Sequence, residues 1–166
     1  MANLPYGVAA TVVLGMLAEV PTIERAVVMV QAEVADRMAA TPGGKDYGAY
    51  TVKLRHRAEP TGRFAVSRNC FMPPPNVDSA VIRLDRVDAS SASALAAGLD
   101  ATADAAFSQR RKTLRNSLAA GLGLSREDVE EALTASGVDG SRRAETLSQD
   151  EFARLAADLG ARGHLT

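Results

Sequence analysis

Two stretches of alternating side chains, joined by three consecutive prolines, constrain most strongly how this chain can fold. Apolar and polar positions alternate in GRFAVSRNC, residues 62–70, and again in VDSAVIRLD, residues 77–85, and this period of two predicts two strands. We expect the connection FMPPPN to be extended and stiff, because proline fixes φ and lacks an N–H donor. The pair is therefore predicted to form the antiparallel edge of a sheet.

The residues before this pair alternate between helical and strand patterns. Apolar side chains surround residues 7–20, which predicts a buried helix, sandwiched between layers and ended by Pro21. The run AVVMV, residues 26–30, predicts a parallel strand covered on both faces. With further helices expected at 31–40 and 50–56, the order of elements indicates an α/β fold.

A stretch rich in Ser and Ala, residues 88–98, precedes a region without any strand pattern. We expect a domain boundary here, between a sheet domain at 1–88 and a small all-helical domain at 89–166. Helices are predicted at residues 95–107, 110–120, 126–136 and 149–159. Two serines begin capping-box patterns and three glycines lie where helix C-caps prefer glycine: Ser125, Ser148, Gly121, Gly137 and Gly160.

The composition excludes several classes of function. The 19 Lys and Arg residues nearly balance the 20 Asp and Glu residues, so a nucleic-acid partner requires a local basic patch. Cys70 has no disulfide partner, and the two histidines give no zinc-like spacing with it. The apolar run at 8–20 is too short to span a membrane. We therefore expect a cytoplasmic protein without a metal site.

The tetrapeptide Asn3-Leu4-Pro5-Tyr6 contains the parts of a site for a flat ring that bears an amino group. The amino nitrogen of adenine is a weak nucleophile, so an enzyme that alkylates it must orient it. An Asn oxygen and the Leu4 carbonyl can accept both amino hydrogens, Tyr6 can stack on the base, and Pro5 stiffens the turn. The same pattern is also an ordinary turn, which this motif alone favours.

Phe71 lies at a predicted strand end, directly before Met72 and the three prolines. A ring fixed there could clamp the second face of a flipped base. When the segment is considered alone, a core or hinge-packing role is favoured. Its combination with Tyr6 favours the base clamp.

A basic run follows the first helix predicted after residue 89. Arg110, Arg111, Lys112 and Arg115 place four positive charges within six residues, and on a helix Arg111 and Arg115 would share a face. This arrangement suits phosphate contacts to a folded RNA, although a solvated helix face is as good an explanation. A second basic zone consists of Lys53, Arg55, Arg57, Arg63 and Arg68.

Five segments, in their order and spacing, resemble the KsgA/RsmA family, the dimethyladenosine transferases of small-subunit ribosomal RNA. They are NLPY at 3–6, QAEVADR at 31–37, FMPPPNVDSAVIRL at 71–84, AFSQRRKTLRNSL at 106–118 and RRAETLSQDEF at 142–152. The proline-rich and QRRKTLRNSL segments are far more specific than NLPY. The resemblance extends over essentially the whole chain.

The resemblance implies an incomplete class I, Rossmann-like methyltransferase sheet followed by a small all-helical domain that recognises rRNA. It implies transfer of methyl groups from S-adenosyl-L-methionine to two adjacent adenines in the 3′-terminal stem-loop of 16S rRNA, during small-subunit assembly and without a metal. The family's adenine motif falls on Asn3, Leu4, Pro5 and Tyr6, and Asn3 also lies at the edge of the donor pocket. The family's second stacking aromatic falls on Phe71. Its RNA contacts fall on Arg110, Arg111, Lys112 and Arg115.

One part of the family pattern is missing at the front of the chain. No Gly-rich turn after a first strand, with an acid after the second, occurs here. We expect a truncated dimethyltransferase that by itself binds S-adenosyl-L-methionine poorly and is inactive. The alternative is a non-catalytic module that binds rRNA or a ribosomal precursor, and a DNA adenine methyltransferase ranks last because it leaves QRRKTLRNSL unexplained.

Overall fold

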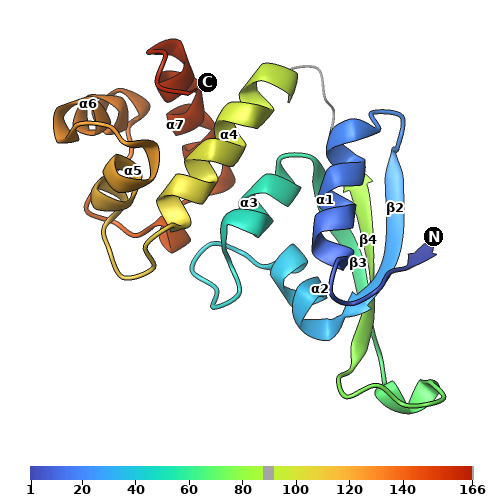
Figure 1. Ribbon diagram of the computed structural model, residues 1–166. Helices are drawn as coiled ribbons and strands as arrows, with labels where there is room; N and C mark the ends of the chain where they lie inside the picture. The colour runs from blue at the N-terminus through green and yellow to red at the C-terminus, as the bar shows by residue number, and fades with distance from the viewer. Residues whose placement is uncertain (88–91, 166) are drawn as a thin grey trace. The chain divides into compact units, whose positions relative to one another are not determined.

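The computed structural model describes residues 1–87 and 92–165 (Figure 1). These residues form two compact units, one from the described residues of Met1–Ala40 and Leu54–Asp88, the other from those of Thr41–Lys53 and Ala89–Thr166. The boundary expected at residue 88 falls outside the described residues. The mixture of sheet and helices confirms the predicted α/β class.

The first unit contains a sheet whose strands lie in the order β1-β2-β4-β3. β1 (Ala2–Asn3) runs parallel to β2 (Arg25–Gln31), whereas β4 (Ser79–Arg86) is antiparallel to both β2 and β3 (Ala58–Val66). The predicted antiparallel edge is therefore confirmed. β3 begins earlier than expected and includes Pro60, which an edge strand tolerates because it needs no N–H there.

The strand β2 differs from the expectation of a parallel strand covered on both faces. It pairs parallel with β1 over two residues and antiparallel with β4 over seven. Val28 and Val30 are buried, while Val27 and Met29, on the alternate positions, are only half-buried. The predicted parallel pairing is confirmed at β1, but the prediction of equal burial on both faces is wrong for the described residues, because a continuous apolar run does not reveal which neighbours a strand will have.

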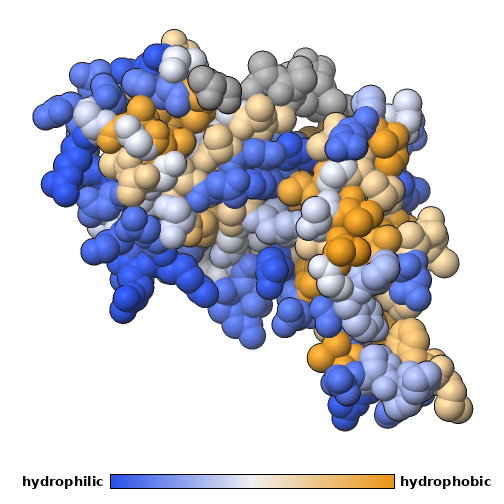
Figure 2. Space-filling view, viewed as in Figure 1, coloured by the Kyte–Doolittle hydropathy of each residue, from blue (hydrophilic) through white to orange (hydrophobic). Residues whose placement is uncertain are grey.

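Helices α1 (Ala9–Glu19) and α2 (Ala32–Ala39) lie on one side of this sheet (Figure 1). α1 buries a single stripe, Ala9, Val13 and Leu17, whereas Met16 is 39% exposed. Figure 2 shows hydrophobic side chains at the surface over α1. The expectation of a helix buried on all sides is therefore wrong for the residues described, because only this stripe of α1 is buried.

The second unit is helical. Its elements are most of α3 (Ala49–Arg55), then α4 (Ala92–Phe107), α5 (Leu114–Leu122), α6 (Arg126–Ser136), the 3-10 turn η2 (Ala144–Thr146) and α7 (Gln149–Ala161). The fully buried large side chains of this part include Leu99, Leu114, Leu118, Leu133, Leu147, Phe152, Leu155 and Leu159. The predicted helices are confirmed, with shifted ends. No described helix is long and apolar enough to cross a membrane.

The cap predictions are partly confirmed. Ser148 and Glu151 form a complete capping box, Ser125 accepts a hydrogen bond from the Asp128 N–H, and Gly137 ends α6 with φ +67°. Gly121 and Gly160 lie inside helices, so their predicted cap roles are wrong. A Cβ on Gly121 would lie 2.6 Å from the Cα of Ala105, so this glycine permits α5 to approach α4 closely.

Candidate functional site

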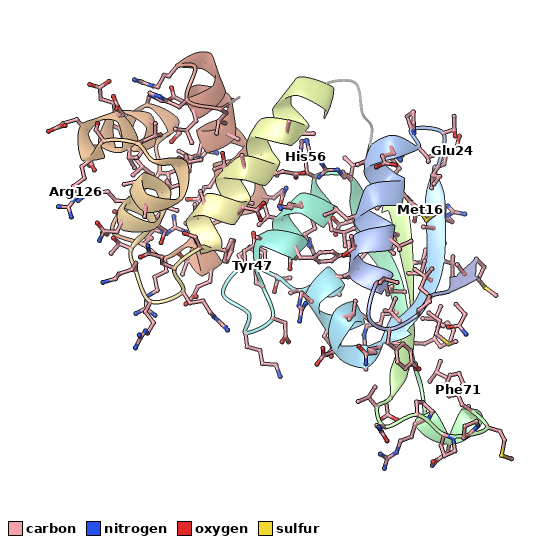
Figure 3. All side chains as sticks on the ribbon, in the orientation of Figure 1. Met16, Glu24, Tyr47, His56, Phe71 and Arg126 are labelled. Atoms are coloured by element: carbon pink, nitrogen blue, oxygen red, sulfur yellow. The ribbon has the colours of Figure 1, made fainter. Side chains whose placement is uncertain are left out.

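A hollow of about 440 Å³ opens in the first unit, where β1 ends beside the connection between β3 and β4. Its lining consists of Asn3, Leu4, Pro5, Tyr6, Phe71, Met72, Pro73 and Pro75. Figure 3 shows Phe71 on the β3–β4 connection. The structure thus brings the tetrapeptide and Phe71 together, although the chain between them is long. We call this the aromatic hollow.

The polar corner of the aromatic hollow is held by the sheet. Asn3 is the register partner of Met29 in β2, and the Leu4 N–H donates to the Met29 carbonyl at 3.3 Å. The short strand β1 therefore supplies the support that such a corner needs. Within the described part of the chain, neither the Asn3 side chain nor the Leu4 carbonyl oxygen has a hydrogen-bond partner. Both oxygens are available to a ligand.

The ring of Tyr6 is fixed by a residue that the sequence analysis missed. Its hydroxyl shares a hydrogen bond of 2.7 Å with Ser79 Oγ, and Ser79 is fully buried at the start of β4. A buried hydroxyl needs such a partner, so the pair holds the ring in place. The sequence feature that could have pointed to Ser79 is its position at the start of a predicted strand, in the segment VDSAV.

The connection that carries Phe71 is anchored at both sides. It contains the 3-10 turn η1 (Arg68–Cys70), where the Ser67 hydroxyl accepts from the Asn69 N–H. Asp78 accepts a hydrogen bond of 2.9 Å from the Arg68 N–H. This turn occupies residues that were predicted as strand, so β3 ends at Val66 and not at Cys70, because these side-chain hydrogen bonds stabilise a turn there.

The lining of the aromatic hollow carries no charged side chain. Two acceptor oxygens, two aromatic rings and three prolines suit a flat, uncharged group with amino hydrogens. Such a site can orient and sandwich a base, but it offers no acid or base for proton transfer. No group of three or more His, Cys, Asp or Glu side chains that could hold a metal occurs among the described residues.

S-adenosyl-L-methionine, implied by the resemblance, has one predicted contact in this chain, Asn3. Among described residues, the glycines with positive φ are Gly43, Gly123, Gly137 and Gly163. Each follows a helix, and none opens a helix after a parallel strand, as a Gly-rich nucleotide-binding turn does. The residues described fit the edge of a donor site and not its nucleoside cradle.

The basic run is exposed but does not form the predicted helix. Arg110, Arg111 and Lys112 lie in the turn before α5, which begins only at Leu114. The N–H groups of Leu114 and Arg115 donate to the carbonyls of Arg142 and Gly140, at 2.7 and 3.1 Å. These tertiary hydrogen bonds satisfy the first turn of α5 and fix where it starts. The helical placement of the run was therefore wrong.

Most other cations of the predicted basic zones are paired with acids. Arg115 forms an ion pair with Glu130, so it is not a free cation as the sequence suggested. The ion pairs in the zone 53–68 include Lys53–Asp104, Arg55–Glu59 and Arg63–Asp36. In contrast, Arg110, Arg111 and Lys112, at the turn before α5, form no ion pair with any described residue.

Solved structures define the class of fold. The chain superposes on a dimethyladenosine transferase from Plasmodium falciparum with a TM-score of 0.79 and 24% identity, over 98% of this chain and 66% of that one. It matches the 23S rRNA methyltransferase ErmE with a TM-score of 0.64 and 29% identity, over 95% and 63% of the two chains. The fold is that of the Rossmann-like methyltransferases.

Sequence relatives identify the family. The family model "Ribosomal RNA adenine dimethylase" matches residues 1–159. The chain is 49% identical over 162 residues to "Ribosomal RNA small subunit methyltransferase A" of Streptomyces avermitilis, covering 97% of this chain and 55% of the relative. The protein of the same name from Streptomyces coelicolor is 50% identical over 157 residues, with 94% and 54% covered.

The chain belongs to the ribosomal RNA adenine dimethylase family, and the predicted resemblance is confirmed. It spans about half the length of the curated relatives it matches.

Proposed function

We propose that this chain forms the adenine-binding part and an RNA-binding part of a small-subunit rRNA adenine dimethyltransferase. The observation that carries the proposal is the aromatic hollow, where Asn3, Leu4, Tyr6 and Phe71 meet. The names of the relatives support ribosomal RNA as the substrate class. The proposed reaction is dimethylation of two adjacent adenines in the 3′-terminal stem-loop of 16S rRNA, in the cytoplasm.

The geometry supports a positioning mechanism. A flipped adenine lies between the rings of Tyr6 and Phe71, and its two amino hydrogens are donated to Asn3 Oδ1 and the Leu4 carbonyl. These contacts aim the nitrogen lone pair away from the ring plane, toward the methyl group that S-adenosyl-L-methionine supplies when bound. Orientation and polarisation of this kind require no covalent intermediate and no metal.

The basic turn supports an RNA partner. Arg110, Arg111 and Lys112 are exposed and form no ion pair with any described residue. A positive side chain without an acidic partner can bind a phosphate directly, because no ion pair within the protein has to be broken first. We therefore assign this turn to the RNA backbone and the aromatic hollow to the base.

The test is methyl transfer from labelled S-adenosyl-L-methionine to a 16S rRNA fragment that contains the 3′ stem-loop. Asn3→Ala, introduced at the aligned position of the Streptomyces coelicolor relative, should lower the rate by about 100- to 1000-fold, because one of the two amino-hydrogen acceptors is lost. Asn3→Asp keeps an acceptor oxygen and should lose less. RNA affinity should be unchanged in both variants, and an unchanged rate in Asn3→Ala would contradict the proposal.

A second candidate function is rRNA binding without methyl transfer. The observation that favours it is that Arg110, Arg111 and Lys112 lie in the second unit, whereas the residues of the aromatic hollow lie in the first. The same experiment separates the two functions. If the protein binds the RNA and Asn3→Ala leaves the rate of methyl transfer unchanged, the result supports rRNA binding without methyl transfer.

A further inference from the structure

Met72 combines two properties that no other large apolar residue of the described chain combines. Its side chain is 97% exposed, and yet it lines the aromatic hollow. Its neighbour Phe71, labelled in Figure 3, lines the same hollow but is half-buried. Met72 therefore lies at the rim of the aromatic hollow, where it can contact a group outside the hollow.

The backbone around Met72 is restrained on both sides. Before it, the Phe71 N–H donates to the Arg68 carbonyl at 3.2 Å, and the Arg68 N–H donates to Asp78 at 2.9 Å. After it come three prolines, residues 73–75, whose rings fix φ. A single exposed apolar side chain is ordinary on a protein surface, but this one is held beside an opening that suits a base.

A flipped base leaves a gap in the strand from which it comes. Only the base enters between the rings of the aromatic hollow, so the rest of the strand must pass its rim. Flipping also breaks the stacking between the flipped base and the next one. Apolar side chains, methionine among them, act as wedges against bases that have been unstacked in this way. The methionine sulfur is polarisable and makes favourable contacts with aromatic rings.

We propose that Met72 packs against the base of the nucleotide next to the flipped adenine and takes the place in the stack that the adenine leaves. The contact joins an apolar side chain to the face of a base, so it requires no charge. Because every base has such a face, Met72 should accept any neighbouring base. This inference rests on the proposed function for the identity of the strand, and it adds a second nucleotide to the site.

Two other roles for Met72 lead to different results. As a further wall of the adenine site, Met72 would contact the flipped base itself, so its removal would weaken the binding of free adenosine. As a docking point for another protein, Met72 would not respond to any nucleotide. A neighbouring base is the ligand that responds to the presence of a second nucleotide and leaves the affinity for adenosine unchanged.

The test follows the methionine methyl groups by NMR, in the 166-residue chain labelled with carbon-13 at its five methionines. Adenosine should leave the Met72 signal nearly unmoved, whereas the dinucleotide adenylyl-adenosine should shift it, because the ring current of the second base acts on the methyl group. Dinucleotides with an abasic ribose on the 5′ or the 3′ side keep the phosphate and should cause no shift. Met16, on α1 and outside the hollow, is the internal control.

Variants of Met72 measure the strength of the contact. Met72→Ala should weaken the binding of the dinucleotide by about 2- to 12-fold, as expected for a contact between sulfur and an aromatic ring, and leave the affinity for adenosine unchanged. Met72→Leu keeps an apolar side chain of similar size and should retain most of the affinity. The matched control is Met16→Ala, which removes a methionine that is 39% exposed and does not line the hollow. It should change neither affinity.

The outcomes separate this inference from the proposed function. A Met72 shift that requires the second base, with a loss of affinity confined to the dinucleotide, supports the inference. Adenosine binding at Asn3 and Phe71 without any response of Met72 to the dinucleotide overturns it and leaves the proposed adenine site intact. Equal losses of adenosine and dinucleotide affinity in Met72→Ala also overturn it, because Met72 would then be a wall of the adenine site. Failure of both ligands to bind in the hollow overturns the inference together with the adenine site.

Discussion

Two regions of this molecule differ in the kind of chemical group that they can bind. The aromatic hollow is lined by rings, prolines and one amide and contains no charge, whereas the basic turn presents Arg110, Arg111 and Lys112 without an acidic partner among the described residues. A base is a flat, uncharged object, and a phosphodiester is a small anion. The comparison teaches that shape selects the base while charge holds the strand.

After the loss expected for Asn3→Ala, the next largest effect should come from removing one wall of the aromatic hollow. Phe71→Ala should lower methyl transfer by about 5- to 160-fold, because stacking on one aromatic ring contributes roughly 1–3 kcal/mol per base. The slope of RNA affinity against salt should stay as in the parent, since no cation is removed. Steady-state transfer rates and salt titrations, at the aligned position of a full-length relative, measure both quantities.

Phe64→Ala is the matched control for this prediction. Phe64 lies on β3, is 61% exposed and does not line the hollow. It should leave the transfer rate nearly unchanged. Equal losses of transfer rate in Phe71→Ala and Phe64→Ala would contradict the assignment, because the effect would then not be specific to a ring that lines the aromatic hollow.

A comparable change in stability should follow from filling the contact between α4 and α5. Gly121→Ala places a methyl group against Ala105 and should lower the free energy of unfolding by about 1–3 kcal/mol. Because the basic turn directly precedes α5, RNA binding should fail at a lower temperature. Gly160→Ala is the control, since its Cβ would meet nothing within 4 Å inside α7. Thermal unfolding followed by circular dichroism measures the difference, and a neutral Gly121→Ala would contradict the close packing.

A smaller effect should come from releasing the Tyr6 ring. Ser79→Ala removes the hydroxyl that holds Tyr6 and should lower transfer by up to about tenfold, as expected for one hydrogen bond of about 0.5–1.5 kcal/mol. Tyr6→Phe breaks the same bond while it keeps the ring. The double variant should therefore be no worse than the poorer single variant. Additive losses in this double-mutant cycle would show that Ser79 acts in another way.

The smallest effect concerns the acid stability of the helical unit. Burial raises the pKa of Glu151, but hydrogen bonds from the Arg142 guanidinium and the Ser148 N–H outweigh it and lower the pKa below the usual 4.5. A lowered folded-state pKa stabilises the fold above the unfolded value, and this contribution is lost as pH falls below 4.5 through the folded value. Glu151→Gln keeps the capping hydrogen bond and should flatten the dependence of the melting temperature on pH in that window. An unchanged dependence would contradict the role of Arg142.

Local patterns predicted the strands and most helices correctly. The alternating runs beside the prolines became β3 and β4, because such elements follow from periodicity within a short segment. The combination of Tyr6 with Phe71 joined two distant motifs; the structure places both residues in one hollow, and their roles in binding a base stay predictions. The Ser148–Glu151 capping box is equally local, and it formed as predicted.

The errors share a different origin, since each depends on a contact between distant residues. The start of α5 is set by carbonyls of Gly140 and Arg142, and Gly121 is required by Ala105 on another helix. Ser79 meets Tyr6 across 73 positions of the chain. No period or motif in the sequence records such contacts.

The most direct test of the central claim is a titration of the isotopically labelled chain with adenosine, followed by amide chemical shifts. The account predicts shifts at Asn3, Leu4, Tyr6 and Phe71, which Phe71→Ala abolishes. N6,N6-dimethyladenosine, which lacks both amino hydrogens, should bind more weakly because Asn3 and the Leu4 carbonyl then have nothing to accept. Equal affinity for the two nucleosides, or shifts confined to other residues, would contradict the assignment of this hollow to the adenine.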